Sequence, residues 1–334
     1  MANTPKTSND AYFQAIFEHY QDRIPDITVN NFKEIGDLIM ERPNMKNEFI
    51  NTLFNKIGLT LLQNKKYTSR LDIFSKGKIE YGETIEQIMC DLIECKDFTE
   101  QKDGNEVSEL VSAQVPDIKV LYHSENYKHK YKVTISDIRL RKAFNDKYGV
   151  DKLVASIITS VQNSIAYDRE CMIKAILSAS IYKQTIPVAY DNGSTGSRAK
   201  KLVTEIKKNI IKMETMSKNY NNAEINTFTR KEDMVLVIAS DYATDIDINL
   251  LSTAFNLDKA EISTRIIVVD ELPVKGEVRP ICVLMDKDYI VDYTTLYEVR
   301  QFENANTLTT NLFYHVWGIM CQNDFTNAIQ FVEA

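Results

Sequence analysis

The stretch from Phe74 to Ile88, FSKGKIEYGETIEQI, combines glycines, lysines and carboxylates, a mixture that also occurs in loops that bind phosphate. A nucleotide-binding loop requires the spacing GxxxxGK[ST] or GxGxxG between a strand and a helix. Here Glu80 and Glu83 lie beside Gly77 and Gly82, and no lysine follows Gly82. Carboxylates at these positions would repel phosphate, so the spacing argues against nucleotide chemistry.

The histidines and cysteines do not have the spacing of a metal site. His123 and His129 are six residues apart in an extended run, which separates them by about 20 Å on one face. Cys90 and Cys95 have opposite parity in a presumed strand, so they would face different ways. We therefore predict no metal and no cofactor.

Candidate catalytic residues are equally isolated. His315 lies between Tyr314 and Val316 in an apolar run. We therefore predict that it is buried and hydrogen-bonded and that it does not act as a catalytic base. The aspartates of SDYATDIDIN lack the glycine and terminal glutamate of a calcium loop. No nucleophile elbow is present. We predict that the chain is not an enzyme.

The elements around these residues follow from apolar periodicity. The strongest signal is 151–181, where apolar residues recur at helical spacing over about 45 Å without proline or glycine. The runs 74–99 and 115–136, joined by the polar tip 101–109, predict a long antiparallel hairpin. Further predictions are helices at 198–218 and 248–256 and strands at 234–240, 265–272 and 281–293, with apolar runs at 312–321 and 328–334. The second half is therefore expected to be α+β, with strands buried on both faces.

Composition restricts the partners. The 334 residues carry a net charge of −7. This charge argues against tight binding of nucleic acid as the main function. No apolar run has the length of a membrane helix, and we expect no membrane contact. Five cysteines without a repeated spacing indicate reduced thiols in a cytoplasm.

Taken in order, several segments resemble the head proteins of small phi-29-like podoviruses, and the order of elements resembles the Hong Kong 97-type (HK-97) capsid fold. No one segment is a catalytic signature, and the specificity of the resemblance comes from their joint occurrence. These segments are NEFINTLFNKIGL (47–59), FSKGKIEYGETIEQI (74–88), VPDIKVLYHSENYKHKYKVTI (115–135), LVASIITSVQNSIAYDRECMIKAIL (153–177), LLSTAFN (250–256) and FYHVWGIMCQNDFTNAIQFV (313–332).

The resemblance implies an α+β HK-97-type fold with four parts. They are an N-terminal arm (1–30), a peripheral domain with a long spine helix (31–68, 135–184 and 289–321), an E-loop hairpin (69–134) and an axial domain (185–288 and 322–334). Some relatives carry an immunoglobulin-like domain after the last strand, and we expect none here because the sequence stops at Ala334.

The resemblance also implies a function. The chain would be a major capsid protein whose hexamers and pentamers form an icosahedral or prolate shell around double-stranded DNA, with each hairpin lying over a neighbour's spine helix. Its partners would be copies of itself, a scaffolding protein, a portal protein and DNA held non-specifically at the inner surface. It would be assembled in the bacterial cytoplasm and reside in the virion. The predicted subunit-interface residues are Lys76, Gly77, Lys78, Glu80, Gly82, Glu83, Glu86, Tyr122, Tyr131, Asp168 and Arg169.

Two alternatives stay open at this point. An encapsulin-like nanocompartment shell has the same fold but encloses enzymes, and genomic neighbours would separate it from a phage capsid. An α+β enzyme or small-molecule binder built on residues 184–334 would need convergent polar groups around a pocket, and no such set can be assembled from these residues.

Overall fold

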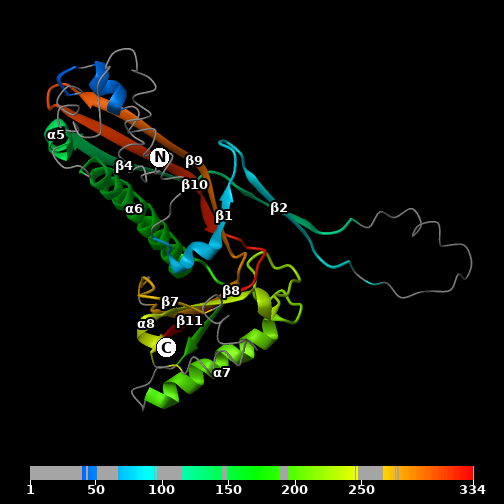
Figure 1. Cartoon of the computed structure of the whole chain (residues 1–334). Coiled ribbons are helices and arrows are strands. Elements are labelled where there is room, and N and C mark those ends of the chain that lie inside the picture. The colour runs from blue at the N-terminus through cyan, green and yellow to red at the C-terminus, as the bar shows by residue number, and fades with distance from the viewer. Residues whose placement is uncertain are drawn as a thin grey trace, which may run out of the picture. The chain divides into compact units, whose positions relative to one another are not determined.

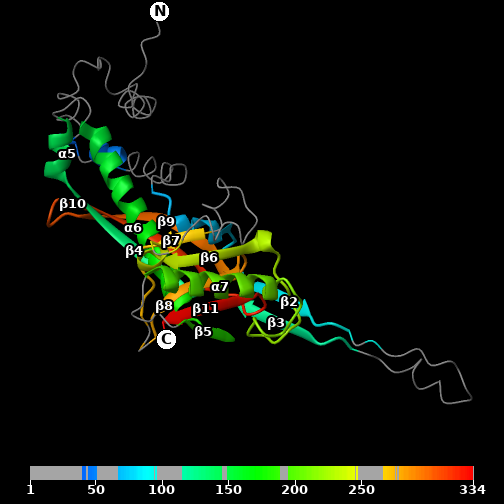
Figure 2. The same cartoon turned by 90° about the horizontal axis from the view of Figure 1, so that it is seen from below.

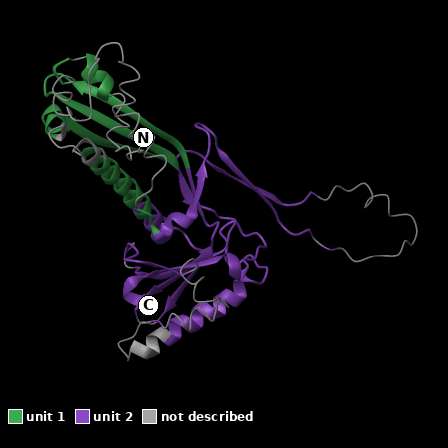
Figure 3. Cartoon of the chain, in the orientation of Figure 1, with its two compact units in different colours: residues 1–69, 127–170, 294–318 green, residues 70–126, 171–293, 319–334 purple. Residues whose placement is uncertain are grey.

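The computed structural model describes residues 40–42, 44–50, 67–93, 95, 115–144, 149–188, 195–244, 246, 266–274, 276 and 278–333 (Figure 1). The predicted arm (1–30), the helix predicted at 248–256 and the hairpin tip (101–109) lie outside these ranges. The chain divides into two compact units, which Figure 3 distinguishes by colour. The first comprises 1–69, 127–170 and 294–318, and the second comprises 70–126, 171–293 and 319–334.

The described elements include both helices and strands. The helices are η2 (Arg70–Phe74), α5 (Asp137–Phe144), α6 (Gly149–Ala179), α7 (Thr195–Met213), η3 (Lys231–Asp233) and α8 (Ser240–Ala243). The strands are β1 (Ser75–Lys78), β2 (Ile85–Cys90), β3 (Ile118–His123), β4 (Tyr127–Ser136), β5 (Gln184–Val188), β6 (Met234–Ala239), β7 (Ile266–Val269), β8 (Pro280–Asp286), β9 (Ile290–Asn304), β10 (Thr309–Gln322) and β11 (Ala328–Glu333). The predicted α+β class is confirmed.

A four-stranded sheet with the order β1-β9-β10-β4 carries the long strands. β4 is an edge strand of this sheet and pairs antiparallel with β10, from Ser136↔Thr309 to Tyr127↔Gly318. Within the first unit, α6 lies along one face of the sheet (Figures 1 and 2). On that face Leu312 and Tyr314 of β10 are buried, because the helix excludes water from them.

The predicted hairpin run 115–136 is not continuous in the structure. Within the described residues β2 pairs with β3 from Ile85↔His123 to Cys90↔Ile118. The alternating run that contains Tyr131, which had been assigned to the hairpin, forms β4 and pairs with β10 instead. The physical reason is burial, because Ile135 of β4 and Leu312 of β10 bury apolar surface there that a two-stranded ribbon could not cover. The four domain limits themselves remain predictions.

The second unit contains a five-stranded mixed sheet with the order β5-β11-β8-β6-β7. Every residue of β6 is buried, as expected for a strand that is covered on both faces. α7 covers one face (Figures 1 and 2), and its apolar stripe, which is at most 1% exposed, consists of Leu202, Ile206, Ile210 and Met213. The C-terminal turns of α6 contact β11, where Gln330 donates a 3.3 Å hydrogen bond to the carbonyl of Leu177. Within the described ranges, no helix has the length and apolar character needed to cross a bilayer.

Candidate subunit interface

The β2–β3 stem has two faces of different character. Directly paired residues share a face, and one face is exposed at every position. Four of its side chains are large and apolar, with exposed fractions of 61% for Ile88, 50% for Ile118, 38% for Val120 and 68% for Tyr122. Glu86, opposite Tyr122, and Cys90, opposite Ile118, complete the face. We call these six residues the stem face.

The opposite side of the stem is attached to its own unit. His123 Nε2 lies 3.1 Å from Gln87 Oε1, and His123 Nδ1 lies 3.0 Å from the sulfur of Cys321. Because the amide oxygen can only accept, Nε2 carries the proton and Nδ1 accepts from the thiol. Burial lowers the pKa of His123 and raises the pKa of Cys321 to about 12, so both groups are neutral at pH 7.

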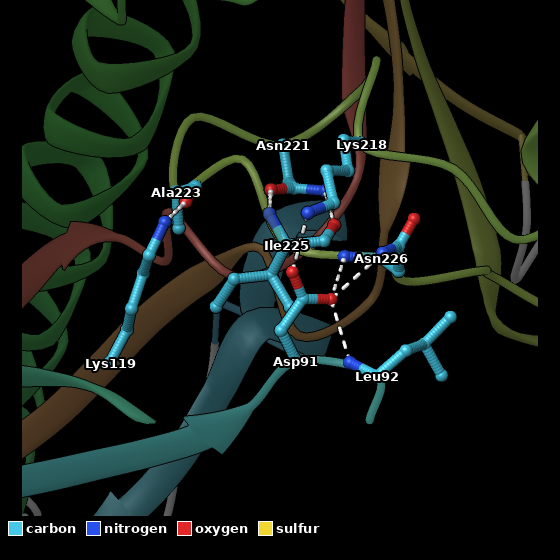
Figure 4. A network of polar contacts seen from close by, with 8 residues as sticks. All are labelled: Asp91, Leu92, Lys119, Lys218, Asn221, Ala223, Ile225 and Asn226. Carbon is cyan, nitrogen blue, oxygen red and sulfur yellow. Dashed lines mark hydrogen bonds and ion pairs between the residues drawn. The ribbon is translucent and has the colours of Figure 1, made fainter. Parts of the chain in front are cut away.

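Asp91 forms the other anchor of the stem (Figure 4). One carboxylate oxygen accepts from Lys218 Nζ at 2.6 Å. The other accepts from the backbone and side-chain nitrogens of Asn226 at 3.1 and 2.9 Å and from the backbone of Leu92 at 2.8 Å. The hydrogen bond from Lys218, followed by those from the two backbone amides, holds the pKa of Asp91 far below its usual range.

The Asp91 cluster is extended by Lys119, whose ammonium donates to the carbonyl of Ala223. The segment that receives it is itself ordered, because Asn221 exchanges hydrogen bonds with the backbone of Ile225 at 2.7 and 2.9 Å. The stem is therefore fixed at its base by charge-assisted hydrogen bonds, whereas its stem face is exposed.

The segment that leads into the stem turns at Glu80–Glu83. The amide of Glu83 donates to the carbonyl of Glu80 at 3.2 Å, and the amide of Glu80 donates to Glu83 Oε2 at 3.1 Å. Gly82 occupies the third turn position with φ +85°, and Gly77 in β1 has φ +109°. Both conformations suit glycine, so these two residues allow the chain to bend here.

Several other predicted interface residues have partners within one chain. Lys76 forms an ion pair with Asp288, and the hydroxyl of Tyr122 donates to Glu86 at 3.0 Å. Tyr131 donates to Asp168 at 2.7 Å. Lys78 is exposed at the end of β1, and Arg169 is half-buried on α6. A role of any of them at a subunit interface stays a prediction.

No arrangement of catalytic or metal-binding side chains occurs in the part of the chain that the structure describes. No group of three or more His, Cys, Asp or Glu there could hold a metal ion, and all five cysteines are free thiols. His315 was expected to be buried and hydrogen-bonded. It is instead only partly buried, and its ring packs edge-on against Trp317 at 6.3 Å between centroids. The error arose because its apolar neighbours Tyr314 and Val316 face the other side of β10.

Sequence reasoning missed the anchor of the stem. Asp91 fell within the extended run predicted at 74–99, and Lys218 within the helix predicted at 198–218, which in fact ends at Met213. Their separation of 127 residues leaves no local signal. A clue was available in the segment SKNYNNAEIN, because three asparagines in six residues favour turns with exposed backbone amides.

Comparisons with known proteins agree on one family. A family model described as Phi29-like phage major capsid protein matches residues 10–332. The major capsid proteins of Bacillus phages GA-1 and PZA are each 28% identical to the chain, over 92% and 95% of its length. The chain spans 66% and 70% of those two relatives.

A solved structure described as the capsid structure of Staphylococcus phage Andhra has a similar fold. It matches with a TM-score of 0.61 at 13% identity and covers 81% of this chain and 88% of its own. The predicted HK-97-type capsid fold is thereby confirmed.

Proposed function

The chain belongs to the Phi29-like phage major capsid protein family, and on that premise we propose that the stem face of one copy binds the next copy in the shell. As a member of this family it is a structural protein of the phage capsid and not an enzyme. The family match also decides against the nanocompartment and binding-domain alternatives. The observation that carries the proposal is a stem held rigidly on one face while four large apolar side chains are exposed on the other.

Burial of the stem face gives a driving force for association. Complete burial of an aliphatic side chain contributes about 1.5–3 kcal/mol, so half-exposed residues such as Ile88 and Ile118 can each gain roughly 1 kcal/mol at a contact. A single contact of this size is weak and reversible. Repetition around a shell makes the sum large while incorrect contacts can still dissociate.

The contact joins two different surfaces, because the stem face of one copy meets another part of the next. Heterologous contacts of this kind close into rings when the rotation between copies is right. Hexamers and pentamers are the rings that a closed shell of this type requires. Scaffolding and portal proteins direct their assembly in the host cytoplasm, and the shell holds double-stranded DNA. The net charge of −7 supports weak, non-specific contact with that DNA.

The decisive experiment places a charge on the stem face. Ile88→Asp should abolish shells when the chain is expressed with its scaffolding protein, as judged by sedimentation and negative-stain electron microscopy. Ile211→Asp is a matched control, because Ile211 on α7 is 62% exposed and Ile88 is 61% exposed. Normal shells from Ile88→Asp, or equal loss from both variants, would contradict the proposal.

A further inference from the structure

The solvent side of α7 is rich in lysine. The apolar stripe of this helix packs on the five-stranded sheet, and helical spacing places a second set of residues on the opposite side, where all of them are exposed. This set consists of Lys200, Lys201, Thr204, Lys208, Ile211 and Lys212. We call these six residues the lysine face.

Most of the charge of the lysine face is not neutralised by its own chain. Lys208 pairs with Glu205 at 3.2 Å, an exposed contact of the kind that contributes little. Among the described residues, no carboxylate pairs with Lys200, Lys201 or Lys212. Lys208 and Lys212 are four residues apart on one helix, a spacing at which like charges destabilise the helix slightly. A bound polyanion would relieve this repulsion.

The lysine face is a basic region of an acidic chain. Residues 200–212 contain five lysines and one glutamate, a net charge of +4, whereas the whole chain carries −7. The rest of the chain therefore carries −11. Because salt screens exposed charges beyond about 8 Å, a local group of lysines can attract an anion although the net charge is negative.

We propose that the lysine face binds the phosphate backbone of the double-stranded DNA that the shell encloses. This proposal rests on the proposed function, in which the shell holds DNA, and it assigns that contact to one surface of the chain. The contact is independent of base sequence, since lysine meets a phosphate as a point charge. The helix from Lys200 to Lys212 is about 18 Å long, and a duplex carries about ten phosphates over that length. The phosphates are therefore dense enough to meet every lysine of the face.

The residue types of the lysine face separate DNA from a protein partner. The cores of protein–protein interfaces are depleted in lysine and enriched in aromatic residues and arginine. The lysine face has the opposite composition, with four lysines, no aromatic residue and one large apolar side chain, Ile211. A polyanion fits this surface better than a folded protein does.

The same composition separates a duplex from a single strand. Proteins that bind single-stranded nucleic acid stack its bases on aromatic side chains. The lysine face contains no aromatic residue that could accept a base. A duplex keeps its bases stacked inside and presents only its backbone charge to such a surface.

The salt dependence of DNA binding tests the proposal. The unassembled chain is titrated with a short fluorescent duplex at several salt concentrations, and anisotropy gives the association constant. Each lysine–phosphate contact contributes about −0.9 to the slope of log K against log salt. Lys201→Gln with Lys212→Gln should therefore reduce the slope by about 1.8. A fourfold rise in salt should then weaken binding by the native chain about tenfold more than binding by the variant.

A second helix supplies the matched control. Arg139→Gln with Lys142→Gln on α5 removes the same charge from two exposed side chains and should leave the slope unchanged. An unchanged slope in the α7 variant, or an equal change in the α5 variant, overturns the proposal. Failure of the native chain to bind the duplex at low salt overturns it as well.

Acetylation of lysines locates the contact in the assembled particle. DNA-filled heads are compared with heads that have released their DNA, so that the shell is the same in both. We expect Lys201 and Lys212 to react several-fold more slowly in the filled heads, and Lys142 to react alike in the two samples. Equal reactivity of the α7 lysines in both samples, or equal protection of Lys142, contradicts the assignment.

An acidic protein is the alternative occupant of the lysine face. Protection of Lys201 and Lys212 in precursor shells that contain scaffolding protein, without protection in DNA-filled heads, would assign the face to that protein and refute the DNA contact. The two proposals also fail separately, because Ile88→Asp leaves the lysine face intact. Shells formed by Ile88→Asp refute only the contact made by the stem face, whereas an unchanged salt slope in the α7 variant refutes only the DNA contact.

Discussion

The hydroxyl of Tyr131 on β4 donates a 2.7 Å hydrogen bond to Asp168 on α6, and so joins the sheet to the helix that lies along it. Burial and the neighbouring Asp168 carboxylate raise the pKa of Tyr131 strongly, so the hydroxyl stays protonated and remains a donor. Both residues were predicted to contact another subunit. Within a single chain they satisfy each other, which gives them a structural role before any assembly occurs.

The first prediction concerns this hydrogen bond. Tyr131→Phe should lower the free energy of unfolding of the unassembled chain by about 1–2 kcal/mol, because a half-buried charged acceptor loses its donor. Urea-induced unfolding measures the change. Tyr122→Phe is the control, because its hydrogen bond to Glu86 is exposed and should contribute less. If Tyr131→Phe blocks assembly and leaves stability unchanged, the residue belongs to an interface after all.

The sequence predicted elements well wherever the signal is local. The long helix was expected at 151–181 and spans Gly149–Ala179, because thirty residues of unbroken helical spacing leave few alternatives. The apolar run at 234–240 became β6 for a similar reason, since a short, wholly apolar run suits a strand buried on both faces.

The sequence could not predict which distant segments pair with each other. Lys76 pairs with Asp288 across 212 residues, and Asp91 pairs with Lys218 across 127. Periodicity shows which face of a segment is apolar but not which segment will cover it. The assignment of the β4 run to the hairpin failed for this reason, because any neighbouring extended run would have satisfied the same alternation.

A second prediction addresses the anchor of the stem. Asp91→Asn should speed amide hydrogen exchange throughout β2 and β3, because the charged acceptor of Lys218 and Asn226 is lost. Mass spectrometry of the unassembled chain measures that exchange. Lys218→Met should act in the same direction, whereas Lys212→Met, which removes an exposed lysine of α7, should have no effect.

The pH dependence of this anchor has a definite sign. The folded chain depresses the pKa of Asp91, so its stabilising contribution is fully present above the unfolded pKa of about 4. It is lost only as the pH falls through the lower folded value. Loss of the anchor between pH 7 and pH 5 would exclude Asp91 as its cause.

A third prediction tests the turn that leads into the stem. Gly82 has φ +85°, and an added Cβ would meet no atom within 4 Å, so a substitution there strains only the backbone. Gly82→Ala should lower the free energy of unfolding by about 1 kcal/mol. Gly82→Asn should cost less, because asparagine tolerates this conformation better. Equal losses in urea-induced unfolding would show that the turn adopts another conformation in solution.

The last prediction concerns acid sensitivity of the stem. Burial lowers the folded pKa of His123, although nearby Asp324 opposes the shift. The neutral ring can accept from the thiol of Cys321 and donate to Gln87 at the same time, whereas the imidazolium cannot accept. The stabilising contribution is therefore present above the unfolded pKa of about 6.5 and is lost as the pH falls through the folded value. The protection of the β2 and β3 amides, which is the exchange rate corrected for the intrinsic effect of pH, should fall between pH 7.5 and pH 5.

His123→Gln separates this effect from general acid destabilisation. The amide cannot take up a proton in this range, so the variant should keep a similar protection of the stem amides at both pH values. That protection should be lower than in the native chain at pH 7.5, because one of the two hydrogen bonds is lost. Exchange in β6, which lies in the five-stranded sheet, provides an internal reference within the same unit. An equal fall of protection in the stem of both proteins would mean that another group carries the acid response.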